Sequence, residues 1–178
     1  MENIQNRENA GAYDKIYVGD IVSKQGRLFL NMREAFPGID EKWFISEFMK
    51  SNVRKMLDFG IPKYAGMSGI EWAHELFYEL GPSKPEEGIF IESDYRRGEE
   101  WGGFLPQWVG IIYALYQWKY NIPSREIIDI LPLDFMERAF PVLHQAGSEV
   151  AVEKIYEDIN SANSVSENTD ENPPNISR

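Results

Sequence analysis

The sequence contains no cysteine and only two histidines. The absence of cysteine excludes disulfide bonds, thiolate nucleophiles, iron–sulfur clusters and zinc sites built from thiolates, and it fits a reducing compartment. No long hydrophobic run is present: the most apolar stretch, residues 104–118, is shorter than the roughly 20 residues that span a bilayer. The first residues, MENIQNRENAGAYDK, hold no apolar segment of the signal-peptide type. We therefore expect a cytoplasmic protein.

Basic side chains are scarce relative to acidic ones. The 18 Lys and Arg residues stand against 29 Asp and Glu residues, which gives a net charge of −11. Such a balance repels phosphate backbones and anionic membranes at long range. The densest basic run is Arg96-Arg97, and it has acidic neighbours. We expect no membrane binding and no nucleic-acid binding, and we interpret the charge as serving solubility or a basic partner.

Aromatic and aliphatic residues, by contrast, are abundant. Hydrophobic residues make up 43% of the 178 positions and include ten Phe, nine Tyr and five Trp. A chain of this length forms one domain and buries enough surface to fold without a metal ion or a disulfide. The composition therefore indicates a single domain with a dense, aromatic-rich core.

Apolar residues recur at helical spacing through most of the chain. The first series covers residues 17–36, and Gly26 is expected to interrupt or split that helix. Asp40 has the position of an N-cap for the next helix, which is expected to end near Gly60.

The central part of the chain repeats this pattern with clearer boundaries. Ser68 and Glu71 have the spacing of a capping box. Pro106 fits the first turn of a helix that reaches about residue 120. That helix is apolar on nearly all sides, which is typical of a helix surrounded by others.

The sequence thus predicts a mainly α fold: a compact domain of six to eight helices packed around a central apolar helix. The domain is expected to cover residues 13–160, after a disordered lead-in over residues 1–12. Residues 161–178 are polar and acidic and predict a disordered tail. Residues 89–91 (Ile-Phe-Ile) are compatible with either a short strand or an ordered loop.

Catalytic and metal-binding motifs are incomplete wherever they begin. His74 and Glu75 start a zincin pattern, but Tyr78 stands where the second histidine is required, and His144 is distant in sequence. Ser68 lies in a sequence like that of a nucleophile elbow, without the second glycine and without a preceding strand. No P-loop, Rossmann or EF-hand spacing occurs. We predict no catalytic residue, no metal site and no cofactor, and we favour a protein that is not an enzyme.

Several large or polar side chains near the central helix are candidates for a binding site. Gln107 and Gln117 are amides within an apolar helix, and a buried amide needs a hydrogen-bonding partner or a groove to face. Trp108 and Trp118 are predicted to be core residues, whereas Trp101, which precedes the helix, fits either the core or an interface. The sequence-based candidates for partner or ligand binding are Trp101, Gln107, Gln117 and His144.

Two stretches carry a family resemblance: SEFMKSNVRKMLDFGIPKYAGMSGIEW and EWGGFLPQWVGIIYALYQWKYNIPSREIIDILPLDFMERAFPVLHQAG. The residues that carry it are Ser51, Asp58, Ser68, Glu71, Trp108, Gly110, Tyr113, Gln117, Trp118, Ser124, Glu126, Ile127 and His144. On these residues the chain resembles, over residues 36–155, an uncharacterised family of small bacterial proteins that is common in Firmicutes. Genes of that family often neighbour genes for toxins of the ADP-ribosyltransferase type. The resemblance implies an antitoxin-like or accessory partner of such an enzyme and assigns no functional residue.

The leading functional hypothesis is a non-catalytic cytoplasmic protein-binding module that neutralises or accompanies a toxin-like enzyme. One alternative is an enzyme or ligand-binding protein with a groove lined by aromatic and Gln side chains, and a pocket containing a few buried polar groups would favour it. Another is an inhibitor that mimics nucleic acid, which a clustered acidic face would favour.

Overall fold

The computed structural model describes residues 12–81 and 103–170, with side chains in the last helix as far as residue 161. Every regular element in these ranges is a helix, which confirms the predicted mainly α class. The α-helices of the described part are α1 (Val18–Ala35), α2 (Glu41–Lys50), α3 (Asn52–Asp58), α4 (Pro62–Ala65), α5 (Gly69–Leu80), α6 (Leu105–Tyr120), α7 (Ser124–Ile130), α8 (Leu133–Leu143) and α9 (Ser148–Asp170). Single 3-10 turns occur at Lys15–Tyr17 and His144–Ala146.

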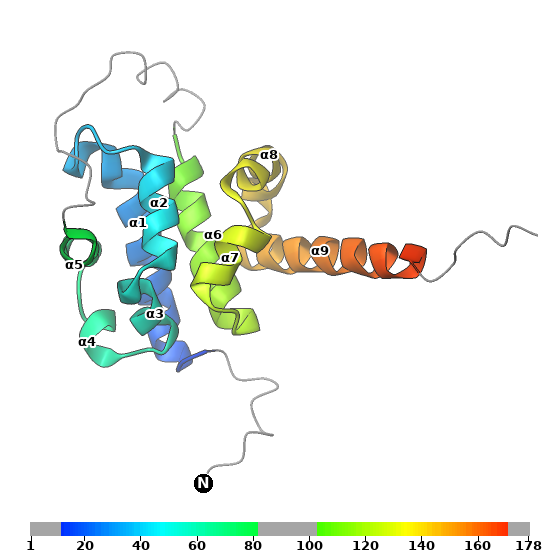
Figure 1. Ribbon diagram of the computed structural model, residues 1–178, viewed down its shortest axis with the longest axis horizontal. Helices are drawn as coiled ribbons and strands as arrows, with labels where there is room; N and C mark the ends of the chain where they lie inside the picture. Colours follow the sequence, from blue (N-terminus) through cyan, green and yellow to red (C-terminus); the bar gives the residue numbers. More distant parts are fainter. Residues whose placement is uncertain (1–11, 82–102, 171–178) are drawn as a thin grey trace, which may run out of the picture.

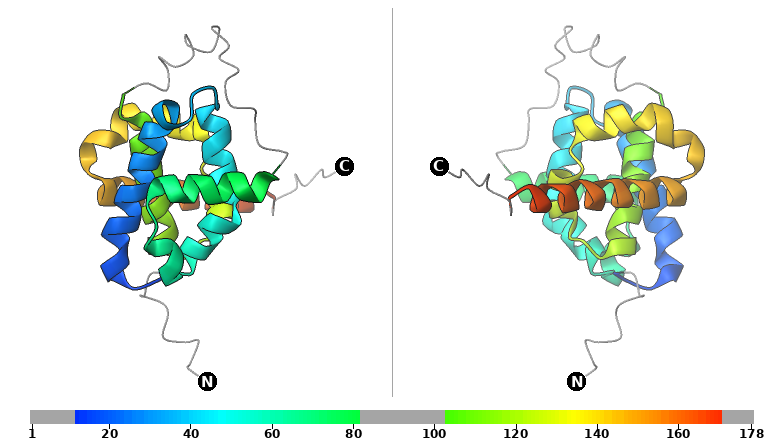
Figure 2. Two further views of the ribbon diagram at one scale, coloured as in Figure 1. Left: turned by 90° about the vertical axis from the view of Figure 1, so that its left-hand side faces the viewer. Right: turned by 90° about the vertical axis from the view of Figure 1, so that its right-hand side faces the viewer.

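The helices are stacked in layers (Figure 1). α1, α2 and α3 form one inner layer and α6 and α7 form the next, so that α1 packs on α6 and α2 on α7. α5 covers the outer side of the first layer, and α8 and α9 cover the outer side of the second. Figure 2 shows that α5 and α9 cross opposite faces of the molecule at a steep angle to the inner helices. α6 is therefore surrounded by helices, as its apolar sequence predicts.

The contact between α1 and α6 depends on two glycines. A Cβ atom on Gly110 would lie 2.8 Å from the carbonyl oxygen of Gln25 and 2.9 Å from the Cα of Gly26. The buried Gln25 side chain donates from Nε2 to the carbonyl oxygen of Gly110 at 3.1 Å. The prediction that Gly26 interrupts its helix is therefore wrong. α1 continues through Gly26, because the close approach of α6 offsets the roughly 1 kcal/mol by which glycine disfavours a helix.

The helix beginnings that the sequence predicts are confirmed in three places. The Asp40 carboxylate accepts from the amide of Trp43 at 2.7 Å. Ser68 and Glu71 form the complete capping box at the start of α5. Pro106 lies in the first turn of α6.

The described part holds nine α-helices rather than six to eight, because the segment that begins at Asp40 is divided. Ser51 has an extended backbone (φ −67°, ψ 160°), which ends α2, and its hydroxyl accepts from the amide of Arg54 at 3.0 Å, which starts α3. A further single turn, α4, follows Gly60.

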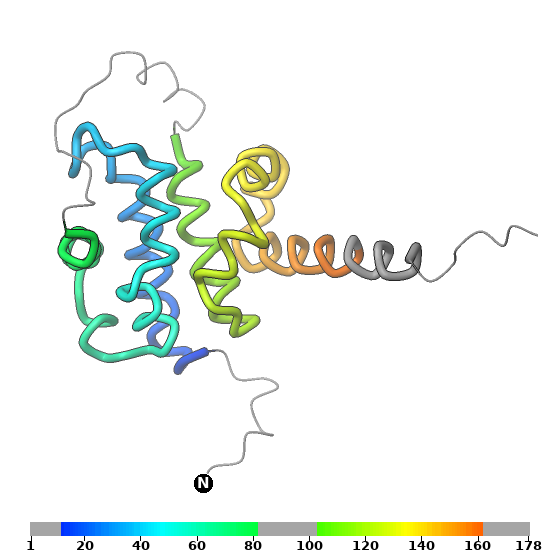
Figure 3. Tube along the Cα trace, viewed as in Figure 1, coloured from blue at the N-terminus to red at the C-terminus, as the bar shows by residue number. Residues whose placement is uncertain are grey.

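The C-terminal helix is longer than predicted. α9 continues to Asp170, past residue 160 where the domain was expected to end, and the disordered tail expected over residues 161–178 is not confirmed. No proline or glycine occurs between Ser148 and Asp170, so nothing in the local sequence stops the helix once its first turns have docked. Ala151, Val152 and Ile155 are the buried residues of that docked part. Figure 3 shows the coloured part of α9 running outward from α6.

Some of the predictions fall on residues 1–11, 82–102 and 171–178, which lie outside the described part. They include the lead-in, the short strand or loop at residues 89–91, and the end of the tail. Although α6 is apolar on most sides, neither it nor any other helix within residues 12–81 and 103–170 has the length and hydropathy to cross a membrane.

Candidate functional site

Hydrogen bonds between Asp58 and Ser124 join α3 to α7. Asp58 is the last residue of α3, and Ser124 is the first residue of α7. The Ser124 amide donates to Oδ2 of Asp58 at 2.8 Å, and the Ser124 hydroxyl donates to Oδ1 at 2.6 Å. α7 has no side-chain cap of its own, because Pro123 is its N-cap residue. Asp58 therefore supplies, from a neighbouring helix, the acceptor that the first amide of α7 requires.

The same carboxylate neutralises a buried arginine. Arg54 lies one helical turn before Asp58 and is 0% exposed, and its Nη1 atom is 3.1 Å from Oδ1 of Asp58. Nε, Nη1 and Nη2 of Arg54 are all buried, and none of them makes a hydrogen bond of good geometry within the described residues, so the contact with Asp58 is an ion pair. A buried guanidinium without its counter-ion would be strongly unfavourable. Asp58 is therefore needed both for the charge of Arg54 and for the position of α7.

The N-terminal segment covers one side of this cluster. Trp118 is half-buried rather than part of the closed core, and its indole Nε1 donates to the carbonyl oxygen of Tyr13 at 2.8 Å. The Trp118 carbonyl accepts from the amide of Ala12 at 3.0 Å. The Tyr13 hydroxyl is buried and has no hydrogen-bond partner among the described residues. Burial raises the pKa of Tyr13, while the nearby Arg54 lowers this pKa and Asp58 raises it.

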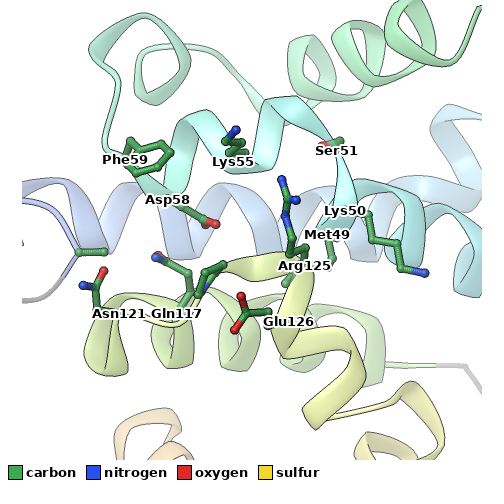
Figure 4. A pocket seen from close by; sticks show the side chains of 12 residues that line it. Met49, Lys50, Ser51, Lys55, Asp58, Phe59, Gln117, Asn121, Arg125 and Glu126 are labelled. Atoms are coloured by element: carbon green, nitrogen blue, oxygen red, sulfur yellow. The ribbon is translucent and has the colours of Figure 1, made fainter.

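A pocket of about 420 Å³ opens beside Asp58, between α2 and α3 on one side and α6 and α7 on the other (Figure 4). Its polar and charged lining consists of Lys50, Ser51, Lys55, Asp58, Gln117, Asn121, Arg125 and Glu126. Ala12, Met49, Phe59 and Pro123 supply the rest of the wall. The volume is within the range of pockets that hold small organic molecules.

Gln117 is the most deeply buried polar group in the pocket wall. Its side chain is 1% exposed, and its Oε1 atom has no hydrogen-bond partner among the described residues. The Gln117 amide and the Asp58 carboxylate point into the pocket from opposite sides (Figure 4). A buried amide that lacks a partner costs about 1–3 kcal/mol. A ligand group that hydrogen-bonds to this amide would therefore be favoured.

Three of the four residues predicted from the sequence lie in the described part of the chain, and these three are not brought together. Gln117 lines the pocket, whereas Gln107 is half-buried at the other end of α6, where its side chain faces Gly26 of α1. His144 is exposed, with its ring stacked on Phe140 at 4.5 Å. Trp101 lies outside the described residues.

The predictions for the other two tryptophans have different outcomes. Trp108 is buried and packs edge-to-face on Phe140 at 5.5 Å, which confirms its place in the core. Trp118 is half-buried and holds residues 12–13, so the prediction of a core role is only partly correct. Its indole N–H requires an acceptor, and the backbone of the N-terminal segment provides one.

Sequence reasoning missed Arg54, Asp58 and Ser124 as site residues. Arg54 and Asp58 have the i, i+4 spacing of an ordinary surface ion pair. The available signal was the position of Arg54 directly after Val53 and three residues before Leu57, on the apolar side of a short helix. In the sequence, Ser124 only marks the start of a helix. The residue that accepts its hydrogen bonds, Asp58, is 66 residues earlier in the chain, so the sequence around Ser124 does not indicate the contact.

The chemistry of the pocket wall is that of hydrogen bonding and charge. The hydroxyl of Ser51, which lines the pocket, donates to the carbonyl oxygen of Phe48 at 2.7 Å, and the hydroxyl of Ser124, which lies behind the wall, donates to Asp58. Both hydroxyls therefore hold the helices together. Within residues 12–81 and 103–161, no group of three His, Asp or Glu side chains is arranged to hold a metal ion.

Comparison of the chain with protein-family models, with curated proteins and with solved structures gives no match. In the all-helical described part of the chain, the pocket beside Asp58 is the feature that bears on function.

Proposed function

We propose that this protein is a non-catalytic binding protein and that the pocket beside Asp58 is its recognition site for a small organic ligand. The observation that carries the proposal is the Gln117 amide, which is almost completely buried, lines the pocket and has an oxygen without a partner. Small-molecule sites typically combine a cavity of this size with a few fixed polar groups.

The rigidity of the wall supports a binding role. Asp58 is fixed by Ser124 and Arg54, and Ser51 is fixed by the caps of two helices. Asn121 ends α6 in the left-handed conformation (φ 53°), which asparagine tolerates better than most residues. Polar groups held in this way lose little conformational entropy when a ligand binds. Their hydroxyls already serve structural acceptors, which fits recognition better than nucleophilic catalysis.

The test is a fragment screen monitored by ¹⁵N-labelled amide spectra of the whole chain. We expect ligands that shift the amide signals of residues around the pocket, such as Lys55 and Asn121. Gln117→Met should weaken their binding by about tenfold, because the loss of a hydrogen bond from a buried site costs about 1.4 kcal/mol or more.

Gln107→Met is the matched control, because it makes the same change on the same helix outside the pocket. It should leave the affinity unchanged. The proposal is wrong if no fragment shifts the pocket amides, or if the two variants bind equally well.

A protein partner is the second candidate for this site, and two exposed apolar side chains favour it. Phe59 lines the pocket and is 64% exposed, and Ile61 follows it with 38% exposed. An exposed aromatic residue beside a polar pocket fits the centre of a protein interface. For this second candidate we propose that the partner is an enzyme of the ADP-ribosyltransferase toxin type, as the family resemblance implies. We propose further that the two proteins meet in the cytoplasm.

Co-expression with the product of the neighbouring gene, followed by co-purification, tests the second candidate. Phe59→Ser should reduce recovery of the complex. Phe104→Ser is the matched control, because Phe104 is 72% exposed at the opposite end of α6. Equal recovery with both variants would contradict an interface at the pocket.

A further inference from the structure

The pocket concentrates positive charge in a protein of opposite overall charge. Its lining has three basic residues, Lys50, Lys55 and Arg125, and two acidic residues, Asp58 and Glu126. The negative charge of Asp58 is already matched by the buried Arg54. The whole chain, in contrast, has a net charge of −11. The excess of positive charge is therefore a local property of this site.

The three cations come from different helices and have no described counter-ion. Lys50 ends α2, Lys55 lies on α3, and Arg125 lies on α7. None of them forms an ion pair with another residue in the described ranges, whereas Arg33 pairs with Glu41 at 3.0 Å. Arg125 extends from α7 toward α3 (Figure 4). Like charges that line one pocket repel each other, and an anion bound among them relieves that repulsion.

We infer that the ligand of this pocket carries an acidic group, a carboxylate or a phosphate, that is bound by Arg125 and Lys55. This inference rests on the proposed function and specifies its ligand class. The planar guanidinium of Arg125 matches two oxygens of either group, and the Lys55 ammonium adds a point charge. The buried Gln117 amide then binds a polar group on the part of the ligand that lies deeper in the pocket. The Asp58 carboxylate, which accepts from Ser124 and pairs with Arg54, stays in place as part of the wall.

The experiment uses succinate and inorganic phosphate as probes and succinamide as the neutral isostere of succinate. Each is titrated into the full-length protein at constant ionic strength, and binding is followed by the shifts of the pocket amides. We expect saturable binding of at least one anion and no saturable binding of succinamide. Binding of succinate alone identifies the acidic group as a carboxylate, and binding of phosphate alone identifies it as a phosphate.

Three variants separate recognition at the pocket from general electrostatics. Arg125→Gln and Lys55→Gln change exposed residues, so both should fold normally, and each should weaken anion binding by about tenfold or more. Lys63→Gln removes the same charge from α4, outside the pocket, and should alter binding by less than about twofold.

The possible failures are distinguishable. If succinamide or neutral members of the fragment screen occupy the pocket while neither anion does, the acidic-group inference is wrong and the ligand-binding proposal stands. The inference is also wrong if Lys63→Gln weakens anion binding as much as Arg125→Gln does. If no probe and no fragment shifts the pocket amides, the proposed function itself is overturned.

Discussion

Asp58→Asn tests the buried ion pair with the smallest change in shape. Asparagine keeps the size of the side chain and one carbonyl oxygen that can accept from Ser124, but it removes the negative charge 3.1 Å from Nη1 of Arg54. Arg54 is completely buried, so its charge would then have no counter-ion and no access to water. Breaking a buried pair in this way costs about 3–5 kcal/mol. We expect the free energy of unfolding to fall by about that amount, a large part of the 5–15 kcal/mol typical of a domain.

Urea unfolding followed by far-ultraviolet circular dichroism measures the change, provided that the slope with denaturant is the same as in the unsubstituted protein. Arg54→Met removes the cation and retains an unbranched apolar side chain. Because the two side chains interact directly, the double variant should be more stable than the sum of the single effects predicts, by about 1–3 kcal/mol. Asp129→Asn changes an exposed residue of α7 and should shift stability by no more than about 0.5 kcal/mol.

The reasoning is refuted if Asp58→Asn costs less than about 1 kcal/mol and the two substitutions are additive to within about 0.5 kcal/mol. That result would mean that Asp58 is not the counter-ion that compensates the charge of Arg54 in solution. The Asp58 carboxylate would then matter to the pocket only through its hydrogen bonds to Ser124.

Three other measurements test separate parts of the structure. Gly110→Ala should destabilise by about 1–3 kcal/mol because its Cβ would overlap the backbone of α1, whereas Gly19→Ala, with open space around it, should stabilise by about 0.4–1 kcal/mol; equal effects in urea unfolding would contradict the close contact. Trp118→Phe should cost about 0.5–1.5 kcal/mol through the lost hydrogen bond to Tyr13 and should speed amide exchange at residue 12; unchanged exchange would count against this attachment. Burial raises the pKa of Tyr116 to about 12, above the ordinary value of 10.0. The folded state therefore holds this proton more tightly than the unfolded state does. The contribution of Tyr116 to the free energy of unfolding should be fully present below pH 10 and should be lost as the pH rises toward 12. A urea midpoint that does not fall between pH 10 and pH 12 would contradict this expectation.

The site was only partly predictable because its residues are selected by helix rotation and by burial. Gln107 and Gln117 gave the same signal, an amide in an apolar helix. Ten residues of helix, however, separate them by about 15 Å and turn them to different sides, so only Gln117 reaches the pocket. The sequence around Arg54 suggested exposure rather than burial, because an arginine four residues before an aspartate usually forms an ion pair on a helix surface. Its complete burial follows from how tightly α3 is enclosed by its neighbours, which spacing along α3 does not reveal.

The sequence by itself determined the features that depend on neighbours along the chain. The helical class follows from the period of the apolar residues, the starts of α2 and α5 follow from Asp40 and from Ser68 with Glu71, and the central place of α6 follows from its lack of a polar face. Only the tertiary structure decided that Gly26 and Gly110 meet and that Asp58 caps a helix 66 residues further on. It also decided that one pocket is lined by three cations that form no ion pair within the described residues. Propensities and caps are set by the residues within a helical turn, whereas burial, ion pairing and cavity shape are set by residues that are distant in sequence and that only packing brings into contact.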